Sequence, residues 1–241
     1  MSGHSKWNNI KRKKEKTDQQ RAKIFTKIGR ELAMVVKAGG ANPEENSKLK
    51  DCIAKAKAAN VPNDNIDRII KKAAGEGNAN DYEEIIYEAY GPSGTAFVVE
   101  TLTDNRNRTA GNMRHYFDKY GGNLGQNGSV MFMFSRKGQI VIDAEGLDEE
   151  QVMDSSLNAG AEDFTAEDGV FEILTDSNEF SAVREALEND GYSFISAEVA
   201  YIPSTYTSLQ SQEDIDKIEK LIDMLEDDDD VQAIWHNWDN E

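Results

Sequence analysis

The chain has 241 residues, 38% hydrophobic and 30% charged, which is enough for two to three small domains with their own cores. Its 27 basic and 45 acidic residues give a formal net charge of -18, and no apolar run approaches the roughly 20 residues that span a bilayer. A single cysteine excludes an internal disulfide and a cysteine-rich zinc site. We therefore expect a cytoplasmic protein without a membrane partner.

The charge is divided unevenly along the chain. Residues 1–75 carry 18 basic and 8 acidic side chains, a net of +10, whereas residues 76–241 carry 9 and 37, a net of -28. A basic region gains free energy on a polyanion through counterion release, and an acidic region repels the same polyanion. This asymmetry predicts an oriented encounter with nucleic acid. The alternative is a basic tail that only improves solubility.

The N-terminal segment concentrates cations around a lone aromatic residue, Trp7, and lacks the apolar stretch of a secretory signal. Such a segment suits a contact that follows a phosphate backbone while the ring stacks on an unpaired base, worth about 1–3 kcal/mol. Alternatively, the arm folds back and packs Trp7 on a domain. The candidate nucleic-acid-binding residues of the arm and the following helix are Lys6, Trp7, Lys11, Arg12, Lys13, Lys14, Lys16, Arg21, Lys23, Lys27 and Arg30.

Residues 18–75 have the pattern of three short helices. The first runs to Lys37, with its cations opposite its apolar face, and Gly39-Gly40 ends it. Residues 42–45, Asn-Pro-Glu-Glu, predict the cap and first turn of a second helix that runs to about Asn60. Cys52 falls on the apolar face of this helix, so we expect it to be buried. The third helix, capped by Asn63, adds the outward-pointing candidates Arg68, Lys71 and Lys72.

From residue 82 onward the pattern is α+β. Residues 82–90 and 95–102 predict strands around a turn, Thr109 is expected to cap a helix, and residues 129–134 predict another strand. Residues 139–200 follow in the order βαββαβ of a ferredoxin-like sandwich. A helix at 213–226 and a strand at 231–235 should return to the earlier unit, whose ββαβ order needs more layers to close.

The predicted fold is therefore α+β and multidomain: an N-terminal three-helix domain followed by two α+β domains, one of them ferredoxin-like and inserted into the other. The predicted ranges are 1–20 for the basic arm, 21–78 for the three-helix basic domain, 79–134 plus 201–241 for the discontinuous α+β domain, and 135–200 for the ferredoxin-like domain.

A second candidate phosphate site is the segment Asp104–Thr109. Two arginines, Arg106 and Arg108, are expected just before a helix whose N-terminus offers free amide donors and a partial positive charge. The alternative is that both arginines pair with acids of their own domain, while the Asn and Thr residues serve turns and caps. The sequence favours neither interpretation over the other.

Other polar residues give no catalytic or metal site. The run Asp227–Asp230 could bind a hard cation, but it lacks the alternating ligands and the glycine of a calcium loop, so we expect a solvated turn. His4, His115 and His236 are scattered, and His115 should be exposed. With no nucleophile and base at a recognisable spacing and no phosphate-binding glycine loop, we expect no enzyme, no cofactor and no small-molecule substrate.

Several strings together resemble the YebC/PmpR family of probable transcriptional regulatory proteins, which is related to the mitochondrial translational activator of cytochrome oxidase. The resemblance runs the length of the chain and rests on Gly3–Trp7, Lys23–Lys27, Ala54–Pro62, Tyr90–Pro92, Leu102–Thr109, Gly121–Gly125 and Gly128–Val130.

This resemblance implies a cleft-containing protein of three domains, without established catalytic residues. It implies DNA-binding transcriptional regulation, although mitochondrial relatives look like translational activators and bacterial members are linked to the ribosome and to stalling at proline-rich sequences. Gln126 and Asn127 stand where many relatives have Glu-Thr, which removes a carboxylate from that loop.

We expect a non-enzymatic, nucleic-acid-binding regulator of gene expression that acts on promoter DNA or on the ribosome and its RNA. The helices lack a recognition surface rich in Asn, Gln and Arg, and a cationic arm with a free Trp suits irregular RNA, so RNA is favoured. The alternatives are a protein-interaction module that uses the acidic face and, last, a nucleic-acid-processing enzyme that uses Asp104 and His115. The oligomeric state stays open, with a monomer expected.

Overall fold

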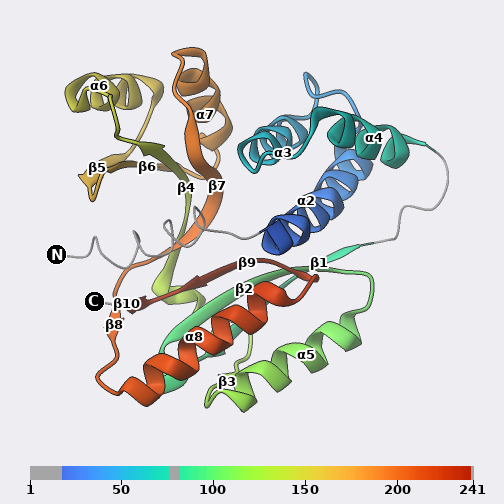
Figure 1. Ribbon diagram of the computed structural model, residues 1–241, viewed down its shortest axis with the longest axis vertical. Coiled ribbons are helices and arrows are strands. Elements are labelled where there is room, and N and C mark those ends of the chain that lie inside the picture. Colours follow the sequence, from blue (N-terminus) through green and yellow to red (C-terminus); the bar gives the residue numbers. More distant parts are fainter. Residues whose placement is uncertain (1–17, 76–81, 240–241) are drawn as a thin grey trace.

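The computed structural model describes residues 18–75 and 82–239, with side chains from Ala22 onward. The first three helices form a separate unit, the helical domain (Figure 1). They are α2 (Asp18–Gly39), α3 (Ser47–Ala58) and α4 (Asn63–Ala74). Their apolar faces enclose a core in which Leu32 and Leu49 are fully buried. Cys52 belongs to this core at 3% exposure, which confirms its predicted burial, and burial raises the pKa of its thiol.

The predicted start of the second helix is wrong. Residues 42–45 form a turn, and α3 begins at Ser47 behind the cap Asn46. The Asn46 Oδ1 atom accepts the Leu49 N–H at 3.1 Å, while its Nδ2 atom donates to the carbonyls of Val35 and Gly40. Asn46 therefore caps α3 and closes the end of α2 with one side chain, which an N-cap at Asn42 could not do.

A four-stranded antiparallel sheet in the order β3-β1-β2-β9 forms the second unit. Its strands are β1 (Glu83–Tyr90), β2 (Ala96–Thr103), β3 (Asn123–Leu124) and β9 (Val231–His236), with a 3-10 turn, η1 (Pro92–Gly94), between the first two. Helices α5 (Arg106–Lys119) and α8 (Gln212–Asp227) cover one face (Figure 1). Since β9 pairs with β2, the chain tail returns to this sheet as predicted.

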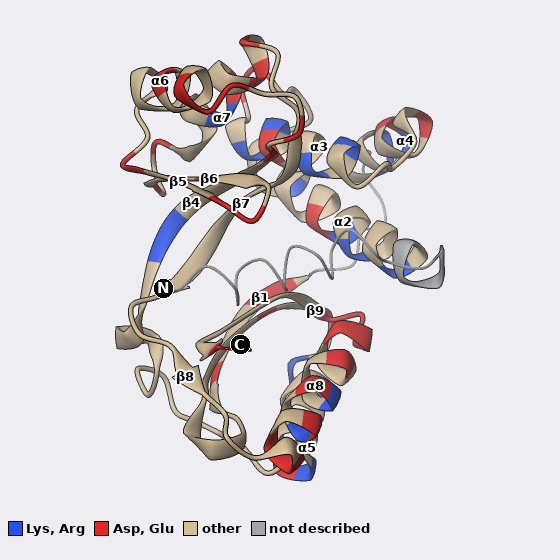
Figure 2. Cartoon of the chain, turned by 60° about the vertical axis from the view of Figure 1, so that its left-hand side comes forward, with Lys and Arg blue, Asp and Glu red and all other residues tan. Residues whose placement is uncertain are grey.

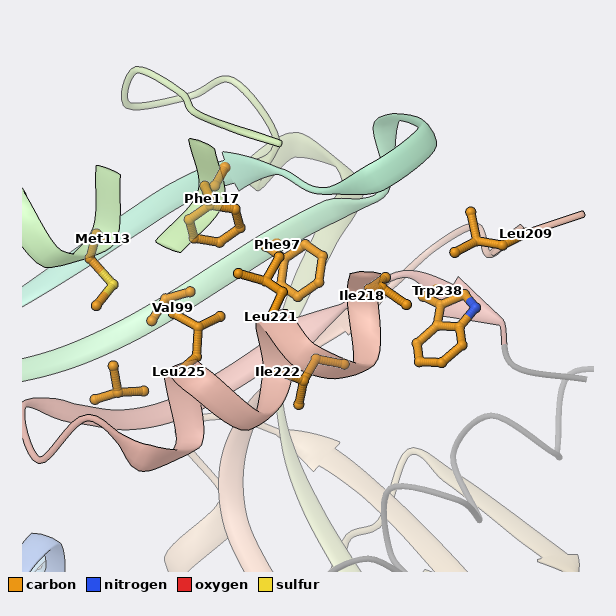
Figure 3. Close-up of a cluster of buried hydrophobic side chains, with 12 residues drawn as sticks. Phe97, Val99, Met113, Phe117, Leu209, Ile218, Leu221, Ile222, Leu225 and Trp238 are labelled. Carbon is orange, nitrogen blue, oxygen red and sulfur yellow. The ribbon is translucent and has the colours of Figure 1, made fainter. Parts of the chain in front are cut away.

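The core beneath α5 and α8 contains side chains from both helices and from the sheet (Figure 3). Phe97 and Phe117 meet edge to face, with ring centroids 5.5 Å apart, and Leu221 and Leu225 of α8 are fully buried. The opposite face of the sheet is partly covered by Phe134 and its neighbours. Burial of both faces explains why β2 is apolar along most of its length.

The third unit has the predicted order βαββαβ. Its elements are β4 (Phe134–Asp143), α6 (Glu149–Ala159), β5 (Asp163–Glu167), β6 (Val170–Asp176), α7 (Phe180–Asn189) and β7 (Phe194–Pro203). The sheet order is β5-β6-β4-β7 with every neighbouring pair antiparallel, which confirms a ferredoxin-like sandwich inserted into the second unit. Two short strands, β8 (Thr207–Ser208) and β10 (Trp238–Asp239), pair in parallel beside the second unit, whose core includes Trp238. The predicted domain boundaries remain predictions.

Three further local predictions are wrong. Asn63 does not cap α4 but is its first residue, and Pro62 stands at the N-cap position. Asn105, not Thr109, caps α5, because the Asn105 Oδ1 atom accepts the Arg108 N–H at 3.1 Å. Residues 129–133 do not form a strand but a turn that ends in a 3-10 turn, η2 (Met131–Met133).

The buried carboxylate of Glu88 explains this turn. It accepts the backbone N–H groups of Gly128, Val130 and Met131 at 2.5, 2.8 and 2.7 Å, so the chain curls around it. Burial alone would raise the pKa of Glu88, but these three donors outweigh it and lower the pKa.

None of the described helices is both long and apolar enough to cross a membrane.

The close approach of Gly122 to β1 gives a testable prediction. A Cβ atom on Gly122 would lie 2.2 Å from the carbonyl oxygen of Tyr90, the residue of β1 that pairs with Asn123. Gly122→Ala should therefore lower the free energy of unfolding by about 1–3 kcal/mol. Gly111, inside α5, has open space where a Cβ atom would lie, so Gly111→Ala should be neutral or stabilising by up to about 1 kcal/mol. Urea denaturation compares the two variants, and equal stabilities would contradict this account.

Candidate nucleic-acid interface

The predicted cations fall into four groups, one of which is Arg106 and Arg108 in the first turn of α5. The arm residues Lys6, Trp7, Lys11, Arg12, Lys13, Lys14 and Lys16, and the side chain of Arg21, lie outside the described part of the chain. The cations of α2 face the second unit, and those of α4 face solvent. Figure 2 shows Lys and Arg along α2 and α3 and many Asp and Glu residues on α8 and on the turn that follows it.

We call Lys23, Lys27 and Arg30 the basic face of α2, and residues 226–230, which join α8 to β9, the acidic turn. The Lys23 Nζ atom donates to Asp227 Oδ1 at 2.7 Å. The Lys27 Nζ atom donates to the Glu226 carbonyl oxygen at 2.7 Å. These contacts join residues about 200 positions apart in the sequence, so the structure brings the predicted basic helix onto the predicted solvated turn.

Arg30 completes this contact. Its Nη1 atom donates to the Asp229 carbonyl oxygen and to Asp230 Oδ1, both at 2.8 Å. Its guanidinium also lies over the Tyr82 ring, 5.5 Å from the centroid. All three members of the basic face of α2 are therefore engaged within the molecule. Their predicted role in nucleic-acid binding stays a prediction.

The carboxylate of Asp230 is the centre of the acidic turn, with a side chain only 4% exposed. Besides Arg30, it accepts hydrogen bonds from Arg108 Nη2 at 2.7 Å, Thr109 Oγ1 at 2.9 Å and Thr103 Oγ1 at 3.1 Å. Burial by itself raises the pKa of Asp230, but the bonds from Arg108, Thr109 and Arg30 outweigh it and lower the pKa. The carboxylate is therefore held in its charged form.

The segment Asp104–Thr109 thus supports the acidic turn, which favours the structural alternative for Arg108. Arg108 also pairs with Asp104 at 2.9 Å, and Arg106 lies 3.3 Å from Glu83 with both side chains largely exposed. Since surface pairs of this kind contribute little, Arg106 can still exchange its partner for a phosphate. A nucleic-acid role for Arg106 and Arg108 stays a prediction.

The prediction that Asp227–Asp230 is a solvated turn holds for the exposed side chains of Asp227 and Asp229 but is wrong for Asp228 and Asp230, because the run meets donors from two helices. Asp228 Oδ2 accepts from Tyr116 Oη at 2.9 Å and from Asn112 Nδ2 at 3.1 Å, while Asp228 Oδ1 accepts the N–H of Asp230. Burial and the nearby Asp228 charge raise the pKa of Tyr116 to about 12. Within residues 18–75 and 82–239, no group of three His, Cys, Asp or Glu side chains could hold a metal ion.

The cations of α4 are arranged differently. Arg68, Lys71 and Lys72 are exposed, and Arg68 donates only to Asn65 of its own helix, at 3.1 Å. No ion-pair partner for these three occurs among the described residues. Of the predicted set in this part of the chain, they are the cations most open to an external phosphate. His115 of α5 is exposed, as predicted.

The helical domain also contacts the ferredoxin-like unit through charged groups. Arg184 of α7, whose side chain is 1% exposed, donates to Asp51 at 2.9 Å and to Glu188 at 2.6 Å. Ser181 bonds to the same Asp51 carboxylate, and Lys50 pairs with Glu185 at 2.7 Å. Sequence reasoning missed this contact and had no signal for it, because its partners come from distant helices.

Acidic side chains gather where the three units meet. Lys55 of α3 pairs with Glu31 of α2 at 2.9 Å, and the charges of Glu100 in β2 and Glu198 in β7 act on the same region. Burial, followed by the charge of Glu84, raises the pKa of Glu100 to about 7, although Lys55 opposes the shift. Glu100 is the only charged residue of β2, which otherwise contains apolar residues and two threonines. Sequence reasoning could have used this signal.

Asp230→Asn should lower the free energy of unfolding at pH 7 by about 1–3 kcal/mol, because an amide cannot accept all four donors. The folded pKa of Asp230 is lowered, so its stabilisation is present above the unfolded value of 3.8 and is lost as the pH falls through the folded pKa. The deficit of the variant should therefore shrink below about pH 4. Denaturation across pH, with the exposed Asp229→Asn as control, tests this, and a deficit that is constant with pH would contradict it.

Glu100→Gln should show the opposite pH dependence. Because the folded pKa of Glu100 is raised, its contribution is fully present below the ordinary value of 4.5 and is lost as the pH rises through about 7. Gln resembles the protonated side chain, so the variant should match the native chain at pH 4 and exceed its stability at pH 8. Melting curves at both pH values, with exposed Glu219→Gln as control, measure this difference. A variant that is less stable at pH 8 would overturn the assignment.

Two models of known protein families match this chain, one over the helical domain and one over the other two units. The TACO1/YebC protein N-terminal domain matches residues 5–76, and the TACO1/YebC second and third domain matches residues 82–238. Proteins named "Probable transcriptional regulatory protein" are 59% identical in Finegoldia magna, over 100% of both chains, and 61% identical in Acetivibrio thermocellus, over 99% of both.

A solved structure agrees with the fold. The crystal structure of a conserved hypothetical protein from Aquifex aeolicus is 42% identical, has a TM-score of 0.83 and covers 92% of this chain and 92% of its own. Both the sequence and the three-unit architecture therefore lead to one conclusion: the chain belongs to the TACO1/YebC family.

Proposed function

We propose that this protein is a non-enzymatic, nucleic-acid-binding regulator of gene expression whose helical domain contacts phosphates. The observation that carries the proposal is the charge division: exposed Arg68, Lys71 and Lys72 lie on a net-positive domain, while α8 presents acids (Figure 2). The acidic units repel the same polyanion, so only the helical domain approaches it. The relatives' name, "Probable transcriptional regulatory protein", supports a regulatory role.

Irregular RNA, such as that of the ribosome, is the favoured target. A helix that reads a DNA major groove presents Asn, Gln and Arg to base edges. The exposed face of α4 instead places Asp64 and Asp67 beside Arg68, and Lys50 and Lys55 of α3 pair with acids. These acids would lie against the phosphates of a duplex, whereas separate cations can contact an irregular RNA backbone.

Promoter duplex DNA is the second candidate, because the relatives are named as transcriptional regulators. In this case specificity would come from the shape of the duplex or from residues outside the described part of the chain. A direct comparison of the two ligands distinguishes the candidates.

The triple variant Arg68→Ala/Lys71→Ala/Lys72→Ala should bind RNA at least about tenfold more weakly and show a shallower dependence of affinity on salt, because fewer counterions are released. The matched control, Lys119→Ala/Lys217→Ala/Lys220→Ala, removes the same charge from the acidic unit and should bind nearly as the native chain does. Affinities are measured for ribosomes, structured RNA and promoter-length duplex DNA over a salt series.

A tenfold preference for ribosomes or RNA, about 1.4 kcal/mol, that persists at salt concentrations that abolish duplex binding would establish the favoured target. Tight binding of one duplex sequence over random DNA would establish the second. If the native chain bound none of the three ligands, the proposed function would be contradicted.

A further inference from the structure

We propose that the acidic turn is an intramolecular competitor for nucleic acid: it occupies the basic face of α2 and is displaced from it by single-stranded RNA. This inference rests on the proposed function and adds its regulation. The basic face of α2 is then a second phosphate-binding surface, covered when no RNA is bound.

The contact resembles that between a helix and a phosphate backbone. Lys23, Lys27 and Arg30 are spaced at i, i+4 and i+7 and so share one side of α2. Their acceptors are the oxygens of one short stretch, two carboxylates and carbonyls at the end of α8. The C-terminus of a helix carries unsatisfied carbonyls and a partial negative charge. The basic face of α2 thus meets a row of negative oxygens, as it would on RNA.

The contact can open without exposing an apolar core. Among the side chains that the structure describes, the buried core of the helical domain is made by α2, α3, α4 and the loops between them. The core under α5 and α8 includes no side chain from the described part of α2. The link to the acidic turn is made by side-chain ends, and Asp227 is 64% exposed. The pair of Lys23 with exposed Asp227 is of the kind that contributes about 0–1 kcal/mol, so a phosphate can replace Asp227 as the partner of Lys23.

Opening also leaves no buried charge without a partner. When Arg30 leaves, the carboxylate of Asp230 keeps its bonds to Arg108, Thr109 and Thr103. This redundancy matters because a stranded buried carboxylate would make opening costly. The bond from Arg30 of α2 to Asp230 can therefore break while the bonds from Arg108 and Thr109 of α5 to Asp230 remain.

Competition of this kind reduces the apparent affinity for RNA by the fraction of molecules that are open. Ligands with few phosphates cannot replace all three contacts at once, so the acidic turn favours continuous polyanions. A purely structural contact would use the same bonds but would stay closed when RNA binds. A competing contact would open, so the distance between the units with RNA bound distinguishes the two cases.

The first test weakens the acidic turn without touching the bonds of Asp230. Asp227→Asn/Asp229→Asn removes two charges near the basic face of α2, and the control Asp118→Asn/Glu219→Gln removes two exposed charges from α5 and α8. The probe is a single-stranded RNA of about 16 nucleotides, the upper range of a common binding site. The first variant should bind about tenfold more tightly than the control.

The second test measures the displacement itself. Spin labels at Ala58→Cys in the helical domain and Asp118→Cys on α5 report the distance between the units by pulsed electron resonance, and buried Cys52 stays unlabelled. Saturating RNA should shift the distance distribution to longer values, and Asp227→Asn/Asp229→Asn should shift it partly without RNA.

Both results are required. Equal affinities of the two double variants, or RNA binding with an unchanged distance distribution, would overturn the competition and leave the proposed function standing. Absence of RNA binding in the native chain and in both double variants would refute the proposed function as well. Binding by Asp227→Asn/Asp229→Asn alone would also overturn the displacement, because RNA would then not open the contact of the native chain.

Discussion

The arrangement of this protein depends on one buried carboxylate, that of Asp230. Its side chain joins α2, β2, α5 and β9, since its donors are Arg30, Thr103, Thr109 and Arg108. The backbone carbonyl of Asp230 also accepts the N–H of Leu102, which fixes the start of β9 beside the end of β2. A charge so deeply buried is stable only because several donors surround it. Loss of that carboxylate would therefore loosen the second unit and its contact with the helical domain together.

The three units are held together by different forces from those that hold each unit internally. Within a unit, apolar side chains form closed cores, of which the Phe97 and Phe117 pair is one example. Between the helical domain and the other two units, ion pairs such as Arg30–Asp230 and Arg184–Asp51 make the contact. Apolar burial stabilises the units strongly and without direction, whereas ion pairs are screened by salt and compete with other charges. The relative position of the helical domain is thus the part of the structure most open to control by a polyanion.

The many acidic residues of the chain have distinct structural roles. Acidic residues of α8 repel phosphates, and those of the acidic turn occupy the cations of α2. Opposite pH responses accompany these roles, because the pKa of Asp230 is lowered by its donors and that of Glu100 is raised by burial and neighbouring acids. Both residues lie at contacts between units, so the protonation of their side chains is linked to the stability of these contacts.

The sequence by itself determined the elements whose cause is local. The periodicity of apolar residues predicted the three helices, the order βαββαβ predicted the ferredoxin-like unit, and the return of the tail followed from a unit that could not close. Local competition was harder to judge: Asn46 and Asn105 proved to be the caps, because each also satisfies the groups around it. Only the tertiary structure decided the role of Asp227–Asp230. Its partner Arg30 is 200 positions away, and no periodicity or spacing encodes which distant cation an aspartate will meet.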